Sequence, residues 1–228
     1  MLAGAGRYTD PWHDHQANAA AVADFLTERG YLAEVRADVD QALAELQTPS
    51  RFGLLAVCVG EAEAASGPAP APAAAAGLEA WFDQGRSLLA VHDATLAFAD
   101  WPGWERQLGA RWIWGETYHP PIGPGLVRID PRAEAGLGRG LADFSLVDEF
   151  YTNFRLADWV RPVAFHRPDS DGPAGARGAA GADQPLAWVR RTANARLAYC
   201  ALGHDSASYQ SPGHRALLGR LLDWLEQG

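Results

Sequence analysis

Two polar residues directly follow one apolar run of this sequence, where a folded chain could use them for chemistry. Leu88–Val91 is typical of a short buried parallel strand, and His92 and Asp93 come immediately after it. Residues Ala94–Ala99 then have the pattern of the first turns of a helix. Because open α/β sheets bind ligands at the carboxyl edge of their strands, the pattern predicts a functional site here, with the His92 ring at the mouth of a cleft. The alternatives are an Asp93 that only caps the helix and a His92 that is structural.

Three further histidines share this placement. His13 and His204 each follow a predicted strand, and His119 follows an aromatic loop. Glu149 is the best carboxylate to join them, because it lies in the otherwise apolar and aromatic run 144–154, where an acidic side chain needs partners. Histidines with one carboxylate suit either a divalent metal, zinc or manganese, or general acid–base chemistry. The sequence contains no HExxH motif, so both alternatives stay open.

The candidate residues fall into three overlapping sets. The candidate catalytic residues are His92, His204 and Glu149. The candidate metal ligands are His13, His92, His119, His204 and Glu149. The candidate substrate-binding residues are Trp12, His13, Asp93, His119 and Asp205. We leave out His166, which lies by a predicted mobile segment, and His214, which lies on the last predicted helix.

Several tryptophans cluster around the same segments. Flat aromatic faces are good platforms for sugar rings, although most tryptophans of a globular protein pack in its core. We expect Trp12 and one of four later tryptophans to line the binding site. Those four are Trp101, Trp104, Trp112 and Trp114.

The elements that must position these residues alternate between strand and helix. The predicted strands of the first half are 1–6, 31–36, 52–59 and 88–91, and the helices between them are 18–29, 39–46 and 78–84. Glu61–Ala76 is a predicted surface loop rich in Ala and Pro. The second half adds strands at 126–129, 163–166, 186–191 and 196–202 and an amphipathic helix after Ser211 and Pro212. This order predicts one α/β domain over residues 1–228 with a mostly parallel sheet and a flexible loop at 168–184.

Composition excludes several classes of protein. The net charge of -9 argues against a nucleic-acid partner, which usually requires a basic face. The sequence has no apolar run long enough for a membrane span and no signal peptide at its start, so we expect a cytoplasmic protein without a membrane partner. It contains no lysine, which excludes Schiff-base chemistry on a lysine of this chain. Cys58 and Cys200 lie in apolar strand-like runs and are expected to be buried, inert thiols without a disulfide.

Several motifs together resemble a known family. They are PWHD near the start, HDATLAFADWPGWERQLGARW, TYHPP, GLADFSLVDEFY and AYCALGHD before the last helix. In this order, and over nearly the whole chain, they resemble the ThuA-like family, which is named for trehalose utilisation. Two features depart from the family pattern. Relatives usually carry a His-Pro dipeptide where this chain has Glu134–Gly136, and the opening strand is unusually short.

The resemblance implies a fold and a field of activity. The fold is that of class I glutamine amidotransferases, a flavodoxin-like three-layer sandwich with a mostly parallel central sheet. Amidotransferases place a nucleophilic cysteine at the turn after the central strand and a histidine before the last helix. Here these positions match His92 and His204, so the resemblance implies the fold without glutaminase activity. It also implies a role in carbohydrate metabolism, on a sugar or an oxidised (3-keto) sugar derivative.

Two readings of the function remain. The first is an enzyme that processes a small-molecule sugar ligand, with His92, His204 and Glu149 handling protons or holding a metal. The second is a non-catalytic module on the same fold that binds a ligand or another subunit. An enzyme pocket should gather several histidines and a carboxylate with shifted pKa values, whereas a binding module should not. Formation of a homo-oligomer stays open.

Overall fold

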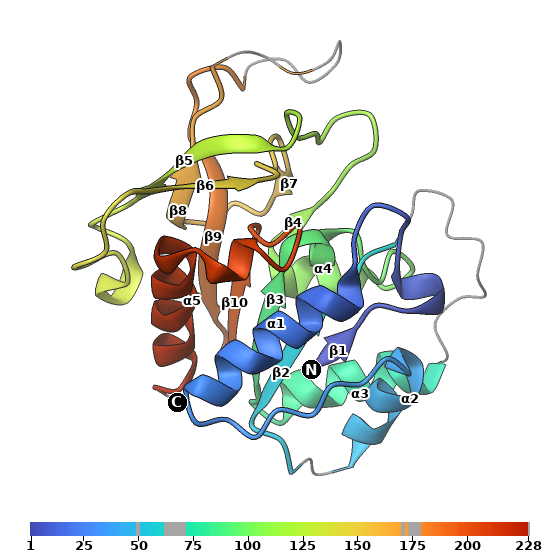
Figure 1. Ribbon diagram of the computed structural model, residues 1–228. Helices are drawn as coiled ribbons and strands as arrows, with labels where there is room; N and C mark the ends of the chain where they lie inside the picture. The colour runs from blue at the N-terminus through green and yellow to red at the C-terminus, as the bar shows by residue number, and fades with distance from the viewer. Residues whose placement is uncertain (49–50, 62–71, 170–171, 173–178, 228) are drawn as a thin grey trace.

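An eight-stranded sheet forms the centre of the protein in the computed structural model, which describes residues 1–48, 51–61, 72–169, 172 and 179–227 (Figure 1). The strand order is β1-β2-β3-β10-β9-β8-β5-β6. These strands are β1 Leu2–Ala3, β2 Leu54–Cys58, β3 Ser87–Val91, β5 Gly123–Ile129, β6 Phe144–Asp148, β8 Pro162–His166, β9 Gln184–Arg191 and β10 Arg196–Cys200. Two short strands, β4 Ala110–Arg111 and β7 Arg155–Leu156, form a separate antiparallel pair. The α-helices are α1 His15–Glu28, α2 Val39–Ala44, α3 Pro72–Asp83, α4 Pro102–Leu108 and α5 Pro212–Leu225.

The sheet has a parallel half and an antiparallel half. Strands β1, β2, β3 and β10 pair in parallel, whereas β9, β8, β5 and β6 each run opposite to their preceding neighbour. With β8 and β6 added to the four parallel strands, six of the eight strands run in one direction. The α/β fold with a mostly parallel sheet is therefore confirmed, and the antiparallel strands extend it.

Helices cover both faces of the parallel half. In β3, neighbouring residues Leu88–Val91 point to opposite faces and are all buried, so each face must be covered by other elements. Helix α1 packs on β1 and β2, and α5 packs on β10 and β3; both cross the front of the sheet in Figure 1. On α3, Trp81 is completely buried, and its indole N–H donates to the Ser87 carbonyl at the start of β3. These layers fix β3 and β10 rigidly, which also fixes the chain that leaves their carboxyl ends.

Some predicted elements differ from the observed ones. The predicted strand 31–36 is reduced to one parallel bridge between Arg36 and Leu2. Its partner β1 contains only two residues, so a longer strand would have no backbone to pair with. The predicted helix 94–99 is wrong: a single 3-10 turn, His92–Thr95, follows β3. Helix α3 begins at Pro72 rather than Leu78, because a proline followed by four alanines favours an earlier helix start.

Two predicted loops lie partly outside the described residues. Residues 62–71 of the loop predicted at 61–76 are among them, as are residues 170–171 and 173–178 of the loop predicted at 168–184. In the part of the chain that is described, no helix combines the length and the apolar character needed to cross a membrane.

The antiparallel strands bring a distant segment back to the parallel half. Strands β5 and β6 cross above the ends of β9 and β10 at the top of Figure 1. Strand β6 contacts both α5 and the 3-10 turn Ser208–Gln210 that precedes it. The residues that follow β6 therefore meet the loops that leave β3 and β10.

Candidate active site

His92 occupies a strained turn at the end of β3. Its φ angle is 46°, in the left-handed region that non-glycine residues rarely adopt, and such strain is typical of functional positions. Nδ1 donates to the carbonyl of Ala201 at 2.7 Å, while Tyr199 donates to the carbonyl of His92 at 2.6 Å. The side chain is only 1% exposed, so the prediction that its ring lies at the mouth of the cleft is wrong. The carbonyl that follows neighbouring strand β10 holds the ring, and the Tyr151 ring stacks on it with centroids 4.5 Å apart.

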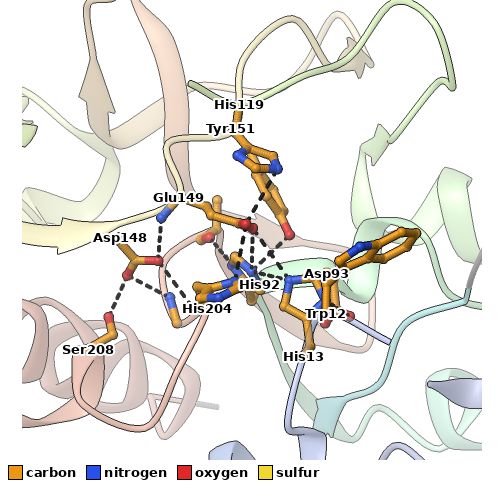
Figure 2. Close-up of polar contacts among 12 residues, drawn as sticks. Trp12, His13, His92, Asp93, His119, Asp148, Glu149, Tyr151, His204 and Ser208 are labelled. Carbon is orange, nitrogen blue, oxygen red and sulfur yellow. Dashed lines mark hydrogen bonds and ion pairs between the residues drawn. The ribbon is translucent and has the colours of Figure 1, made fainter. Parts of the chain in front are cut away.

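His13 meets His92 from the loop before α1. The two Nε2 atoms lie 3.1 Å apart (Figure 2). Nδ1 of His13 contacts both carboxylate oxygens of Asp10, at 2.9 and 2.8 Å. A carboxylate and a carbonyl can only accept, so both Nδ1 atoms carry hydrogen in the neutral rings and both Nε2 atoms carry a lone pair. The hydroxyl of Tyr151 donates to Nε2 of His92 at 2.8 Å.

Glu149 joins the histidines from the end of β6. Oε2 lies 3.4 Å from Nε2 of His13 and 3.4 Å from Nε2 of His92. Oε1 lies 3.2 Å from Nδ1 of His204 and 3.4 Å from Nε2 of His119. The carboxylate is 4% exposed, so four imidazoles are its main polar surroundings in a site that is nearly closed to solvent.

The pKa values of this cluster are strongly shifted. Burial lowers the pKa of His13, but the hydrogen bonds to Asp10 and Glu149 and the charge of Asp93 outweigh burial and raise it to about 10. Burial raises the pKa of Glu149, but its contacts with His13, His204 and His92 hold it well below its usual range. The carboxylate of Glu149 raises the pKa of His204. The centre of the cluster therefore favours positive charge.

Four residues of the cluster have the arrangement of a metal site. One ligand atom from each of His13, His92, His204 and Glu149 lies within 4.8 Å of all the others. Nδ1 of His204 is buried and forms no hydrogen bond within the described part of the chain. His119 does not belong to this group of four, although it was expected to, because only its contact with Oε1 of Glu149 reaches the cluster.

Asp93 lies behind the cluster. Its carboxylate accepts from Nε2 of His15 at 2.6 Å and lies 3.6 Å from Nδ1 of His13. Burial raises the pKa of Asp93, but His15 and the other histidines outweigh it and lower it to about 2. The side chain caps no helix and is 1% exposed, so it cannot touch a ligand in the pocket as predicted; it supports two histidines instead.

A pocket of about 420 Å³ opens above these residues. Its polar lining includes Glu149, Tyr151, His204 and His119. Its apolar and aromatic lining is Trp12, Trp112, Trp114, Leu96 and Ile122. Trp12 is 61% exposed, which is unusual for so large an apolar side chain. Trp112 and Trp114 both line the pocket, whereas only one of the later tryptophans was expected to. Their rings pack edge to face with centroids 6.0 Å apart, so the two lie together.

Other candidate residues lie elsewhere. Asp205 is exposed, and its carboxylate accepts from the backbone N–H groups of Ala207 and Ser208, which makes it a turn residue. Cys58 and Cys200 are free and buried as expected. Burial raises the pKa of both thiols, that of Cys200 to about 12.

Three residues of the site are not among the candidates predicted from the sequence. Asp10 precedes His13 by three residues in a loop, a spacing that places a carboxylate beside the ring. Tyr151 follows Glu149 by two residues in the motif DEFY, within the apolar and aromatic run 144–154. Asp148 precedes Glu149 in the same run. No local pattern distinguishes these three from ordinary loop and core residues.

Comparison with solved structures shows the same fold. A ThuA-like protein of Parabacteroides merdae matches 100% of this chain with 89% of its own, at a TM-score of 0.74 and 17% identity. A ThuA-like protein of Bacteroides uniformis matches 98% of this chain with 89% of its own, at a TM-score of 0.70 and 18% identity. A protein of Salmonella typhimurium described as cytoplasmic matches 91% of this chain with 86% of its own, at a TM-score of 0.57 and 12% identity.

Comparison of the sequence gives the family. No curated protein matches the chain. The family model described as ThuA, trehalose utilisation, matches residues 7–225, which includes every residue of the histidine cluster. The chain therefore belongs to the ThuA family, whose description names a process of carbohydrate metabolism.

Proposed function

We propose that this protein is a metal-dependent enzyme of carbohydrate metabolism that acts on a sugar or an oxidised (3-keto) sugar derivative. The metal is a divalent ion, zinc or manganese, held by His13, His92, His204 and Glu149. The ligand class rests on the family, whose description is trehalose utilisation, and on the aromatic pocket. The metal rests on the geometry of the cluster.

One observation carries the metal. Nε2 of His13, Nε2 of His92 and Oε2 of Glu149 form a triangle with edges of 3.1, 3.4 and 3.4 Å. Ligands placed about 2.0–2.1 Å from zinc in a tetrahedron are separated by about 3.3–3.4 Å, so the triangle has the size of one tetrahedral face. In the neutral rings each corner presents a lone pair inward, and lone pairs this close repel unless a cation or a proton lies between them.

The surroundings of the triangle suit such an ion. Nδ1 of His13 donates to Asp10 and Nδ1 of His92 donates to the Ala201 carbonyl. Metal-bound histidines usually make this second hydrogen bond, which fixes the ring and its tautomer. Nδ1 of His204, which lies 3.2 Å from Oε1 of Glu149, supplies a third nitrogen and the fourth ligand atom. Imidazole and carboxylate together suit zinc, and manganese accepts the same donors.

The remaining residues suit a sugar substrate. A bound metal would polarise a carbonyl or hydroxyl oxygen of the sugar. Burial, followed by the charges of Asp93 and Glu149, raises the pKa of Tyr151 well above its usual value, so its hydroxyl stays a proton donor beside the cluster. Trp12, Trp112 and Trp114 supply apolar faces for a sugar ring beside the polar lining. We expect no glutaminase activity, because His92 occupies the turn where amidotransferases place their thiol.

Metal analysis tests this proposal. We expect protein purified without a His tag to bind one zinc or manganese ion, to lose it to a chelator, and to gain thermal stability when either ion is returned. His92→Asn tolerates the left-handed turn but removes a ligand, and we expect it to bind the ion at least about 100-fold more weakly. His166→Asn, outside the cluster, should bind like the wild type. A wild-type protein that contains no metal and is not stabilised by added zinc or manganese would contradict the proposal.

An activity measurement tests the substrate class. We expect the metal-loaded protein to convert a 3-keto derivative of trehalose, and we expect the chelated protein not to. Binding of that sugar without any turnover, by wild-type protein that holds its metal, would instead support a ligand-binding module.

A further inference from the structure

We infer that Asp148 is a positioning residue that sets the relative placement of Glu149 and His204, two of the proposed metal ligands. The inference rests on the proposed function, because it assigns Asp148 a role in metal affinity. Asp148 itself touches neither the pocket nor the inward faces of the ligands. It acts by accepting hydrogen bonds from the backbone N–H groups of Glu149 and His204.

The carboxylate of Asp148 accepts four hydrogen bonds (Figure 2). Oδ1 accepts from the backbone N–H of Glu149 at 2.8 Å and from that of His204 at 3.1 Å. Oδ2 accepts from the backbone N–H of Gly203 at 2.9 Å and from the hydroxyl of Ser208 at 2.5 Å. The same side chain therefore holds the segment after β6 and the segment after β10.

Only a carboxylate fits these contacts. An ionised carboxylate offers about four acceptor sites and no donor, which matches four N–H and O–H groups. Asparagine would offer one oxygen and turn an NH₂ group towards two of the donors. Asp148 is 2% exposed, so water cannot replace a lost partner, and a buried N–H that loses its acceptor stays unpaired at a cost in stability.

A buried chain of hydrogen bonds fixes Asp148 from the other side. Ser208 donates its hydroxyl proton to Asp148, so its oxygen accepts from Nδ1 of His214 at 3.0 Å. Nε2 of His214 then faces Sγ of Cys200 at 3.5 Å, at the end of β10. The carboxylate is thus anchored to the strand whose exit loop carries His204.

The placement matters because the two ligands come from different halves of the sheet. Glu149 follows an antiparallel strand and His204 follows a parallel one, and they are 55 residues apart in the sequence. Their side chains meet at 3.2 Å between Oε1 and Nδ1. A shift between the two loops would open that contact and move both ligands away from His13 and His92.

Metal titration of Asp148→Asn tests the inference, with Zn²⁺ and Co²⁺ as probes. We expect Asp148→Asn to bind Zn²⁺ about 10- to 100-fold more weakly than the wild type, as for other residues that support metal ligands. We also expect its visible Co²⁺ spectrum to change, because the ligand geometry changes. Asp143→Asn is the matched control: its exposed carboxylate accepts one backbone N–H, from Ile129, away from the site.

Ser208→Ala provides a second variant that keeps the carboxylate. It removes one of the four donors, and we expect a smaller loss of Zn²⁺ affinity, of about 3- to 10-fold. A folded Asp148→Asn with wild-type Zn²⁺ affinity and Co²⁺ spectrum would overturn the inference alone. If Asp148→Asn does not fold, an unchanged affinity in Ser208→Ala overturns it. A wild type that binds neither ion overturns the proposed function, and this inference with it.

Discussion

His13 and His92 bring their Nε2 atoms to 3.1 Å from one another, although 79 residues separate them in the sequence. In both rings Nδ1 donates to another partner, which is the Asp10 carboxylate for His13 and the Ala201 carbonyl for His92. Two lone pairs therefore point at the same space. This relationship requires a cation or a proton between the rings, and the nearby oxygen of Glu149 completes a site for either.

The backbone strain at His92 gives a first prediction. His92→Ala and His92→Gly both remove the ring, but only glycine adopts a φ of 46° without cost. We expect His92→Gly to be more stable than His92→Ala by about 1 kcal/mol in urea unfolding. The control pair is Val91→Gly and Val91→Ala, one residue earlier at a φ of -126°, where alanine should be the more stable. His92→Ala equal to or more stable than His92→Gly would contradict strain at this turn.

The close approach of Gly60 to Asp93 gives a second prediction. A Cβ atom at Gly60 would lie 2.0 Å from the Asp93 carboxylate and 3.3 Å from Nε2 of His15. We expect Gly60→Ala to lower the free energy of unfolding by about 1–3 kcal/mol, because the buried carboxylate must move. Gly53→Ala is the control, since its Cβ would meet no atom within 4 Å. Equal melting temperatures of the two variants would argue against a fixed position for Asp93.

The hydroxyl of Tyr151 gives a third prediction. It is 2.8 Å from Nε2 of His92, and a metal on that nitrogen would release the hydroxyl for a substrate oxygen. We expect Tyr151→Phe to keep Zn²⁺ affinity within about 3-fold but to lower turnover of the 3-keto sugar about 100- to 1,000-fold, as for the loss of a hydrogen-bond donor to a developing charge. Isothermal titration measures the first quantity and initial rates the second. Unchanged turnover with full metal loading would exclude Tyr151 from the chemistry.

The exposed ring of Trp12 gives a fourth prediction. Because Trp12 is 61% exposed and packs little, Trp12→Ala should leave the melting temperature nearly unchanged. We expect it to weaken binding of the 3-keto sugar by about 10-fold, because an aromatic platform is lost. Leu32→Ala is the control, since Leu32 is 99% exposed and does not line the pocket. An equal, small effect of both changes on sugar binding would remove Trp12 from the site.

Two buried histidines outside the site give a fifth prediction, on pH. Burial lowers the pKa of His166 and of His214 to about 4, below the usual value near 6.5. Between these values the unfolded chain binds more protons than the folded one, so stability falls as the pH falls from about 6.5 towards 4. Each histidine contributes up to about 1.4 kcal/mol per pH unit in this window.

Urea unfolding at a series of pH values measures this dependence. We expect His166→Asn to reduce the slope of unfolding free energy against pH by about one proton. Leu32→Ala, which changes an exposed side chain without a titratable group, should leave that slope unchanged between pH 6.5 and 4. A slope in His166→Asn equal to that of the wild type would show that His166 titrates normally in the folded protein.

The class of fold and the position of the central strand were predictable from the sequence. The short apolar run Leu88–Val91 is typical of a buried strand, and its alternation with amphipathic helices favours a parallel sheet. Although the strand before Glu149, β6, was not predicted, the sequence also predicted that His92 and His204 follow the ends of strands. These are properties of short stretches, so local pattern was enough to read them.

Which of these residues meet depends on the tertiary structure. Strands β5 and β6 extend the sheet beyond β8 and bring Glu149 to His92, a contact that depends on the pairing of distant strands. Burial of His92 and Asp93 follows from neighbours far away in the sequence, such as Ala201 for His92 and His15 for Asp93. Asp10, Tyr151 and Asp148 gain their roles in the same way. A hydrogen bond between distant segments leaves no periodic trace in either segment, so the sequence alone could not show it.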